Sequence, residues 1–373
     1  MNCEPGEQRN LGGHEWDVEH FSLCLRLAKE SKSLTVSVWG ALITKMHDFL
    51  CKDLSGTSSE ISRLALRDAC LVLQYHRVAS LCFDPLQLAV EPYNFEGQIE
   101  YLARNFNVIS MDEMKQHLET SRPFEERTVV ITFDGGYADV LYTAKDVLDR
   151  FDVPATVFAS SANILEKRRI WWKELEDFLI ANPCKGRLDV EIDGRFRRWP
   201  LSTQLDRFRA YEDLYSIVSN KTSPEQEAII EQITASVHLQ AEELDDHRTM
   251  SAEELRKITE GGAIAVGGHT HSYVKLSCLP KWQQVEEILR NKEILQEVLG
   301  QDIEYFAYPF GNDGGYTPET MRILQDVGFS LACGGSYGTV SATGRDGFYE
   351  LPRVKVGNWG AFTFYRFLRS FFE

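Results

Sequence analysis

Several polar residues stand directly after short apolar runs of the sequence, at positions where catalytic side chains are often found. His76 follows LVLQY, Asp134 follows TVVITF, His269 follows AIAVGG, and Tyr308 with Pro309 follows EYFA. In a parallel α/β fold the carboxyl ends of the strands meet at one edge, and functional groups collect there. We therefore expect these residues to converge on one rim.

Asp134 has the strongest local context for chemistry. Gly135 and Gly136 follow it and leave the backbone open to a ligand. A carboxylate there can act as a general base or as a ligand for a hard metal ion. The sequence equally allows a structural role, in which the aspartate makes an Asx turn and the glycines supply the turn geometry.

A second candidate lies in residues 265–280, AVGGHTHSYVKLSCLP, where His269 and His271 are two residues apart. Histidine nitrogens are common metal ligands. A spacing of two places both side chains on one face of an extended strand, whereas they diverge if the stretch begins a helix. The alternative is a pair of surface histidines in a polar turn.

The elements that would position these residues begin at about residue 69. Short apolar strands alternate with amphipathic helices, for example at residues 93–106, where Phe95, Ile99 and Leu102 recur at helical spacing. Ser251 and Glu254 fit a capping box at the start of another helix. This alternation predicts a parallel sheet or barrel.

Two regions interrupt or precede that pattern. Residues 163–248 are charged, carry the adjacent Trp171 and Trp172, and predict a helical insertion. Residues 1–65 show helical periodicity, predict an N-terminal helical segment, and contain no catalytic motif.

Composition limits the class of protein. The 373 residues include 40 Lys and Arg against 56 Asp and Glu, for a formal charge of −16. Nucleic acid is bound mainly through cationic contacts to phosphate, so it is a poor partner for this chain. No apolar run predicts a membrane span, the first residues lack the pattern of a secretory signal, and the eight cysteines are scattered. We expect a cytoplasmic protein with free thiols.

The motifs together resemble a known family. TFDGGY (132–137), GGHTHSYVKLSCL (267–279), YFAYPFG (305–311) and LPRV (351–354) occur in an order similar to that of NodB-like polysaccharide deacetylases of the carbohydrate esterase type. The resemblance covers about residues 66–370 and includes RIWWKELEDFL, which is similar to an insertion of one bacterial subgroup. It implies an α/β fold, a distorted (β/α) barrel over residues 66–373, with the helical insertion at about 163–248.

The resemblance also implies a metal site, from which this chain departs. Active members use a divalent metal, often zinc, and carry TFDDG, whose first Asp is the base and whose second is a ligand. Here Asp134 is present, but Gly135 replaces the ligand. The histidine motif supplies ligands at its first and fifth positions, which are His269 and Tyr273. A neutral tyrosine is a weak zinc ligand, so we expect the usual site to be incomplete, with His269 as its one retained ligand. Candidate replacements are His271, Asp139 and His76.

The expected substrate-binding residues are His76, Tyr137, Tyr308, Pro309 and Arg353. Arg353 could pair with Asp134 or with substrate, or could form an ordinary surface salt bridge. Tyr137 and Tyr308 flank the motif loops and could stack on a sugar, although such rings more often line a core. The Trp171–Trp172 pair is expected to pack the insertion against the barrel.

Three functions are consistent with these motifs. The first is hydrolysis of an N-acyl amide, acetyl or formyl, on an amino sugar or a related acylated small molecule. Asp134 and His269 are its expected catalytic residues, with Asp134 as the base and His269 either binding a remodelled metal or polarising the carbonyl without one. The second is an inactive relative that binds a carbohydrate or a protein. The third is a different reaction on the same scaffold. The sequence does not decide whether the chain forms a homo-oligomer.

Overall fold

The computed structural model describes residues 68–166, 170–181, 186–236, 248–311, 314–343 and 347–372. The chain divides into two compact units, residues 1–60 and 61–373, and every described residue belongs to the second. The helical segment predicted over residues 1–65 lies outside the described residues.

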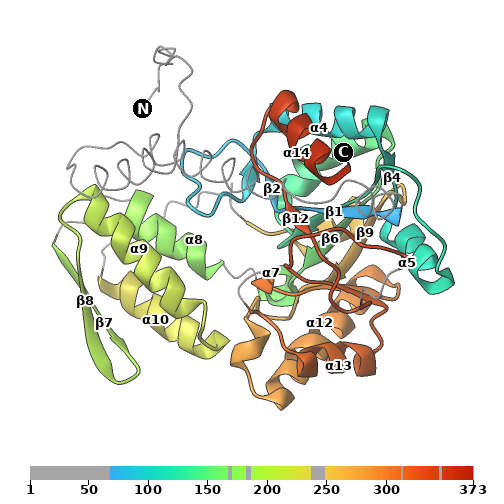
Figure 1. Cartoon of the computed structure of the whole chain (residues 1–373). Helices are drawn as coiled ribbons and strands as arrows, with labels where there is room; N and C mark the ends of the chain where they lie inside the picture. Colours follow the sequence, from blue (N-terminus) through green and yellow to red (C-terminus); the bar gives the residue numbers. More distant parts are fainter. Residues whose placement is uncertain are drawn as a thin grey trace, which may run out of the picture. The chain divides into compact units, whose positions relative to one another are not determined.

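A single parallel sheet organises this unit (Figure 1). Its eight strands confirm the predicted parallel α/β arrangement. In spatial order they are β11 (Leu331–Cys333), β10 (Tyr305–Ala307), β9 (Ile264–Gly268), β6 (Ala155–Ala159), β5 (Thr128–Asp134), β1 (Cys70–Tyr75) and β12 (Val354–Lys355), with β4 (Asn107–Val108) also on β5. A separate short pair joins β2 (Arg77–Val78) to β3 (Ala89–Val90).

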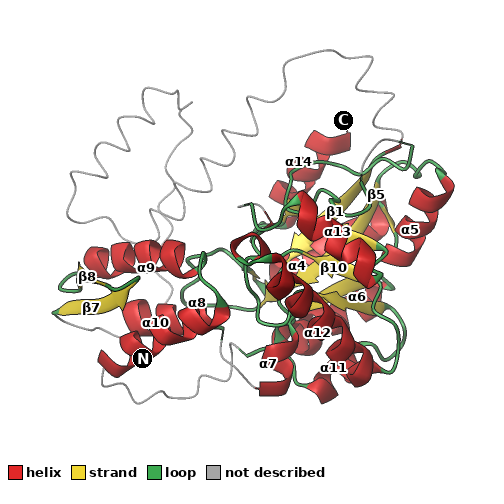
Figure 2. Ribbon diagram, turned by 90° about the horizontal axis from the view of Figure 1, so that it is seen from below, coloured by secondary structure: helices red, strands yellow, loops and turns green. Residues whose placement is uncertain are grey.

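Helices surround the strands, as Figure 2 shows. They are α4 (Pro92–Asn105), α5 (Met111–Thr120), η2 (Val140–Ala144), α6 (Lys145–Phe151), α7 (Ser161–Glu166), α11 (Ala252–Ile258), η5 (Leu276–Cys278), α12 (Lys281–Leu299), α13 (Pro318–Val327) and α14 (Ala361–Phe372). The capping box predicted from Ser251 and Glu254 is present at the start of α11. Because helices cover the sheet, β5 and β6 are buried along their whole length.

Successive residues of each strand belong to two different parts of the core. In β1, Leu71 and Leu73 join the large core cluster, whereas Cys70 and Val72 join a smaller one. The smaller cluster also contains Val130 of β5. Side chains alternate between the faces of a strand, so Gln74 and Asp134 continue the face of the smaller cluster. That face therefore turns polar at the carboxyl ends of β1 and β5.

The segment before β12 links the two edges of the sheet. Leu351 forms a parallel bridge with Cys333 of β11, and the next strand, β12, pairs with β1. Arg353 lies between these two attachments, with its backbone N–H donating to Ser336 O at 2.9 Å. This closing segment therefore holds Arg353 over the face of the smaller cluster, at the polar carboxyl ends of β1 and β5.

The insertion contains one element that the sequence analysis did not predict. Its helices are α8 (Trp171–Glu176), η3 (Asp177–Ala181), α9 (Gln204–Val218) and α10 (Ser223–Ser236). Between them β7 (Arg187–Ile192) and β8 (Arg195–Pro200) form an antiparallel hairpin. Leu188, Val190 and Ile192 are buried. The insertion is thus largely, but not wholly, helical.

Among the described helices, none has the length and apolar character needed to span a membrane.

Candidate active site

Asp134 is the last residue of β5. Its carboxylate is buried, and both of its oxygens accept hydrogen bonds. Arg353 Nη1 donates to its Oδ1 and Arg353 Nη2 to its Oδ2, both at 2.7 Å, and Gln74 Nε2 donates to Oδ2 at 2.7 Å. Burial raises the pKa of Asp134, but the charge and hydrogen bonds of Arg353, together with the nearby His269 and His76, outweigh burial and hold that pKa well below its usual range. Asp134 is therefore ionised at every physiological pH, and it is a weak base.

Arg353 is the partner of Asp134, which is one of the two roles expected for it. Its side chain is only about 1% exposed, so the alternative of an ordinary surface salt bridge is wrong. Nε also donates to Gly334 O at 3.1 Å, and the neighbouring charge of Asp134 raises the pKa of the guanidinium against the effect of burial. A bidentate pair of this kind fixes both groups rigidly.

His269 follows β9 and is 1% exposed. Its Nδ1 lies 2.7 Å from Ala307 O, which can only accept, so Nδ1 carries the proton and Nε2 presents a lone pair. Nε2 is buried and has no hydrogen-bond partner among the described residues. Burial lowers the pKa of His269 to about 4, against the opposing charge of Asp134. His269 is therefore neutral near pH 7, with an unused acceptor.

Tyr273 packs against the ring of His269. Its ring stands edge-to-face with His269, with 4.6 Å between the ring centroids, and makes a similar contact with Trp172 at 4.6 Å. Burial raises the pKa of Tyr273 well above its usual value, so the phenol keeps its proton. Tyr273 and Thr270 both have left-handed backbone, with φ of 56° and 62°. Such strain in residues other than glycine gathers at functional sites.

Gly135 sits where the resemblance predicts a ligand carboxylate, and the structure leaves little room for one. Its φ is +95°, and a Cβ atom there would lie 2.7 Å from Cε2 of Tyr137. The Tyr137 ring is held in turn by Arg77, whose guanidinium carbon lies 4.8 Å from the ring centroid. A bulky aromatic side chain thus fills the position next to Asp134.

His76 joins the same group of charges. Burial lowers the pKa of His76 to about 3, with Asp134 opposing that effect and Lys355 and Arg353 reinforcing it. Lys355 pairs in register with Gln74 across β1 and β12, and its Nζ donates to Leu86 O at 2.9 Å. The structure therefore brings His76, Asp134 and His269 together, as the strand-end rule predicts, and adds Arg353 to them.

Two other residues that were candidates for metal ligands, His271 and Asp139, form hydrogen bonds with other partners. His271 Nδ1 lies 2.8 Å from Ser161 Oγ, and its backbone N–H donates to Glu287 O. Asp139 accepts from Arg77 Nε at 2.8 Å and from the Val78 N–H at 3.0 Å. Neither side chain is available as a replacement ligand at His269.

The two tyrosines expected to stack on a sugar are buried. One face of Tyr308 is covered by Tyr316 at a centroid distance of 3.9 Å, and its hydroxyl donates to Tyr349 O at 2.8 Å. Tyr137 is 2% exposed beneath Arg77. Pro309 is buried as well. These residues shape the walls of the site, and we correct the expectation that the two rings are open to a sugar.

The residues present do not fit the metal centre that the family resemblance implies. No three His, Cys, Asp or Glu side chains of the described residues lie close enough to share an ion. His269 Nε2 is a suitable donor, but Asp134 is taken by Arg353, and Gly135 and the protonated Tyr273 supply no further anionic ligand. The position suits a hydrogen-bonded site better than a metal centre.

Two residues of the site are not predicted by the sequence analysis, and a third, Trp172, is predicted only to pack. Gln74 is a polar residue at the end of an otherwise apolar strand, a signal that the sequence does contain. Lys355 follows the LPRV motif closely, but only the strand register places it beside Gln74. Trp172 was expected to pack, and it does so directly on Tyr273.

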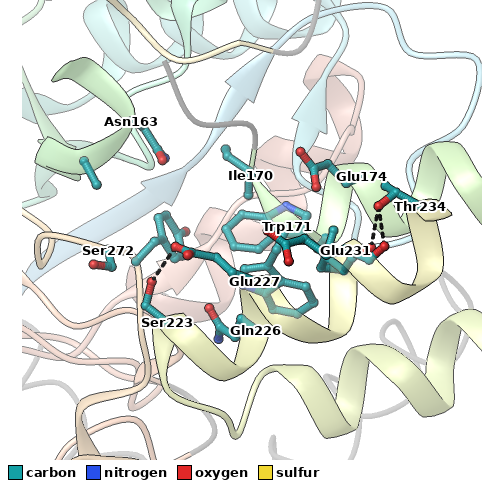
Figure 3. Close-up of a pocket in the computed structure, with 14 residues that line it drawn as sticks. Asn163, Ile170, Trp171, Glu174, Ser223, Gln226, Glu227, Glu231, Thr234 and Ser272 are labelled. Atoms are coloured by element: carbon teal, nitrogen blue, oxygen red, sulfur yellow. Dashed lines mark hydrogen bonds between the residues drawn. The ribbon is translucent and has the colours of Figure 1, made fainter. Parts of the chain in front are cut away.

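A pocket opens on the other side of Tyr273, between α8 and α10 of the insertion and the loop that carries Ser272 (Figure 3). Its volume is about 480 Å³. Tyr273 thus separates His269 from a cavity large enough for a sugar ring.

The buried neutral state of His269 predicts a specific dependence of stability on pH. Its pKa is about 4 in the fold and about 6.5 in the unfolded chain. The unfolded chain therefore binds more protons between these values, and stability falls as the pH is lowered through that window. Between pH 7 and pH 5 we expect His269 to account for a loss of about 2 kcal/mol.

Urea unfolding at the two pH values measures this effect. His269→Asn should reduce the pH-dependent loss by about that amount. An identical pH dependence in wild type and His269→Asn would contradict the neutral, buried assignment.

Comparisons with known proteins agree with the fold and with the order of the motifs. A family model described as polysaccharide deacetylase matches residues 121–181 and 229–332, on both sides of most of the insertion. The assignment made from the motifs is confirmed, and the chain carries a domain of the polysaccharide deacetylase family, whose reaction is hydrolysis of a carbon–nitrogen bond.

Individual relatives are distant. The Bacillus subtilis (strain 168) protein YxkH, whose name assigns it to the polysaccharide deacetylases, is 20% identical over 287 residues, covering 76% of this chain and 70% of that protein. The Ammonifex degensii IcaB structure has a TM-score of 0.53 at 20% identity, covering 82% of this chain and 98% of that one. The Streptococcus pyogenes deacetylase PplD, in complex with acetate, has a TM-score of 0.51 at 16% identity, covering 78% and 93%. These two likenesses confirm the curled (β/α) fold.

Proposed function

We propose that this chain hydrolyses an N-acyl amide, acetyl or formyl, on an amino sugar, without the three-ligand metal centre typical of its family. The observation that carries the proposal is the lone pair of His269 Nε2, which is buried and unpartnered beside an ionised carboxylate. A buried acceptor without a partner costs stability, so its presence favours a role in binding or catalysis.

The base in this reaction is His269 rather than Asp134. Both groups are unprotonated near pH 7, but Arg353 makes Asp134 the weaker base. Nε2 takes a proton from water as the water oxygen attacks the amide carbon. The imidazolium then returns that proton to the leaving nitrogen, which gives a carboxylic acid and an amine. The nearby charge of Asp134 stabilises the imidazolium while it exists.

In this proposal Tyr273 supplies the hydrogen-bond donor that polarises the amide carbonyl. Its phenol stays protonated, because burial raises its pKa well above the usual value. An O–H donor placed beside His269 can stabilise the oxyanion that forms on the amide oxygen. A neutral tyrosine at the fifth position of the histidine motif would then replace the polarising role of a cation.

Amide hydrolysis by the purified chain tests the proposal, with N-acetyl and N-formyl amino sugars and their short oligomers as substrates. We expect hydrolysis that persists after prolonged treatment with a strong chelator. Activity that disappears with the chelator and returns with zinc would overturn the metal-independent assignment.

A Tyr273→Phe variant tests this donor separately. The ring and its contacts with His269 and Trp172 remain, and only the donor is lost. We expect kcat to fall by about 10²–10³ with little change in KM, as when an oxyanion donor is removed. Tyr316→Phe, which loses a hydroxyl bonded to Glu350, is the matched control and should keep full activity. An unchanged kcat in Tyr273→Phe would assign Tyr273 to packing alone.

One observation favours a second function, a binding protein without catalysis. Asp134 is fully engaged by Arg353 and Gln74, and Tyr137 fills the space beside it. In that case the chain would bind amino-sugar oligomers but hydrolyse none of the substrates above. Binding by calorimetry without product release separates this function from the first.

A further inference from the structure

The loop that carries the two proposed reacting groups leaves the sheet directly after β9. The ladder of β9 ends at Gly268, which pairs with Ala159 of β6 and with Phe306 of β10. His269 comes next, and the left-handed backbone of Thr270 prevents the chain from continuing as a strand. Both residues are buried, so their polar backbone groups need partners other than a neighbouring strand.

Side chains supply those partners for His269. Its backbone N–H donates to Asn291 Oδ1 at 3.0 Å, and its carbonyl accepts from Ser160 Oγ at 2.6 Å. Nδ1 is bonded to Ala307 O, which leaves Nε2 as the one polar atom of His269 without a partner among the described residues. Three separate segments therefore hold the residue and give Nε2 a defined position.

Asn291 lies in α12 and is completely buried. Its Nδ2 donates to Ala159 O at 3.0 Å, so both ends of the buried amide are hydrogen-bonded. A Cβ atom on Gly268 would lie 2.6 Å from Asn291 Oδ1, so this close approach depends on the glycine. Asn291 thus ties His269 to the last residue of the neighbouring strand.

Glu287 lies one helical turn before Asn291 and holds the other end of the same loop. Its carboxylate accepts from the Ser272 N–H at 2.8 Å and from Ser272 Oγ at 2.9 Å, and its backbone carbonyl accepts from the His271 N–H at 3.0 Å. Ser272 directly precedes Tyr273, whose backbone is left-handed. Residues four apart share one face of a helix, so a single face of α12 holds both ends of the loop.

We propose that Asn291 and Glu287 are positioning residues that set Nε2 of His269 and the phenol of Tyr273 in place relative to each other. The inference rests on the proposed function, which makes these two groups the base and the hydrogen-bond donor. Asn291 acts through His269, and Glu287 acts through Ser272 on Tyr273. α12 packs against α7 and β9 (Figure 1), so the helix that carries both residues is itself anchored in the fold.

Two substitutions of similar size separate the hydrogen bonds of Asn291 from its volume. Asn291→Leu loses both bonds, and we expect kcat to fall by about 10²-fold with little change in KM, as for a misplaced catalytic group. In Asn291→Asp burial keeps the carboxyl protonated, so its O–H can donate to Ala159 O while its carbonyl accepts from the His269 N–H. Asn291→Asp should therefore recover most of the lost rate. Glu293→Gln, an exposed substitution on α12, is the control and should keep the wild-type kcat.

Double variants show whether each residue acts through its assigned partner. Glu287→Gln loses one of the two bonds to Ser272, and we expect kcat to fall by about tenfold. The same substitution should have no further effect on kcat in a Tyr273→Phe background, and Asn291→Leu should have none in a His269→Asn background. Independent, multiplicative effects in these double variants would overturn the positioning roles.

A second readout does not depend on hydrolysis. In protein labelled with nitrogen-15 histidine, the imidazole signals of His269 are those absent from His269→Asn, and in the wild type they should report a proton on Nδ1. We expect these signals to shift or broaden in Asn291→Leu and to stay in place in Glu293→Gln. Should Asn291→Leu not fold, Asn291→Ala, which removes both bonds without adding bulk, replaces it in every comparison.

The two proposals can therefore fail independently. Unchanged His269 signals in Asn291→Leu would overturn the positioning role whether or not the chain hydrolyses amides. Displaced signals in a protein that hydrolyses none of the substrates would keep the role of Asn291 in holding His269 and reject the hydrolase.

Discussion

Replacing Arg353 by methionine should lower the free energy of unfolding by about 3–5 kcal/mol. The substitution leaves Asp134 buried with only Gln74 as a side-chain donor, and an uncompensated buried charge is far more costly than a lost surface pair. Chemical unfolding near pH 7 measures the effect. This is the largest stability change that we expect from a single polar substitution in the chain.

Two comparisons make that result specific. Lys281→Met removes the cation of an exposed pair with Glu319 and should cost less than about 1 kcal/mol. Combining Arg353→Met with Asp134→Asn removes the stranded charge, so the double variant should regain much of the loss. A double variant no more stable than Arg353→Met would show that packing, rather than the ion pair, explains the effect.

Replacing His269 by asparagine should reduce kcat for amide hydrolysis by about 10²–10⁴, the usual contribution of a general base. The asparagine amide can still donate to Ala307 O in place of Nδ1, but it has no equivalent of the Nε2 lone pair. KM should change little, because the substitution removes proton transfer and leaves the aromatic walls in place.

The pH profile provides the readout that distinguishes a base from a structural residue. The wild-type rate should fall at acid pH as His269 becomes protonated, and the residual rate of His269→Asn should lack that limb. His117→Asn serves as the control histidine substitution and should keep the wild-type profile. A His269→Asn enzyme that retains both the rate and the acid limb would exclude His269 as the base.

Much of this arrangement can be predicted from the sequence because strand ends are easy to recognise. The apolar runs before His76, Asp134 and His269 correspond to β1, β5 and β9, and parallel pairing brings their ends together. The family motifs add Arg353, although only chain closure through Leu351 and β12 places it on Asp134. That contact joins residues far apart in sequence, which periodicity cannot relate.

The direction in which a side chain points is harder to predict from the sequence than its place along a strand or loop. Tyr137 and Tyr308 flank the motif loops as expected, yet both rings turn inward, because each has a partner that the sequence does not identify as a neighbour. The tautomer of His269 depends likewise on a backbone carbonyl of β10. Such contacts are made by tertiary packing alone.

The hairpin of the insertion was missed for a different reason. Leu188, Val190 and Ile192 alternate with polar residues, and Asp193–Gly194 is a strong two-residue turn signal, with φ of 54° and 70° in the structure. The pattern was therefore readable. The many charged residues around it favour a helical insertion instead, which conceals the hairpin.

The close approach of Tyr137 to Gly135 also limits which side chains position 135 can carry. An aspartate at 135 would need a left-handed backbone and a new place for a ring that Arg77 covers and Trp172 contacts through a hydrogen bond. Adding a carboxylate beside Asp134 therefore requires that Tyr137 be moved or replaced as well.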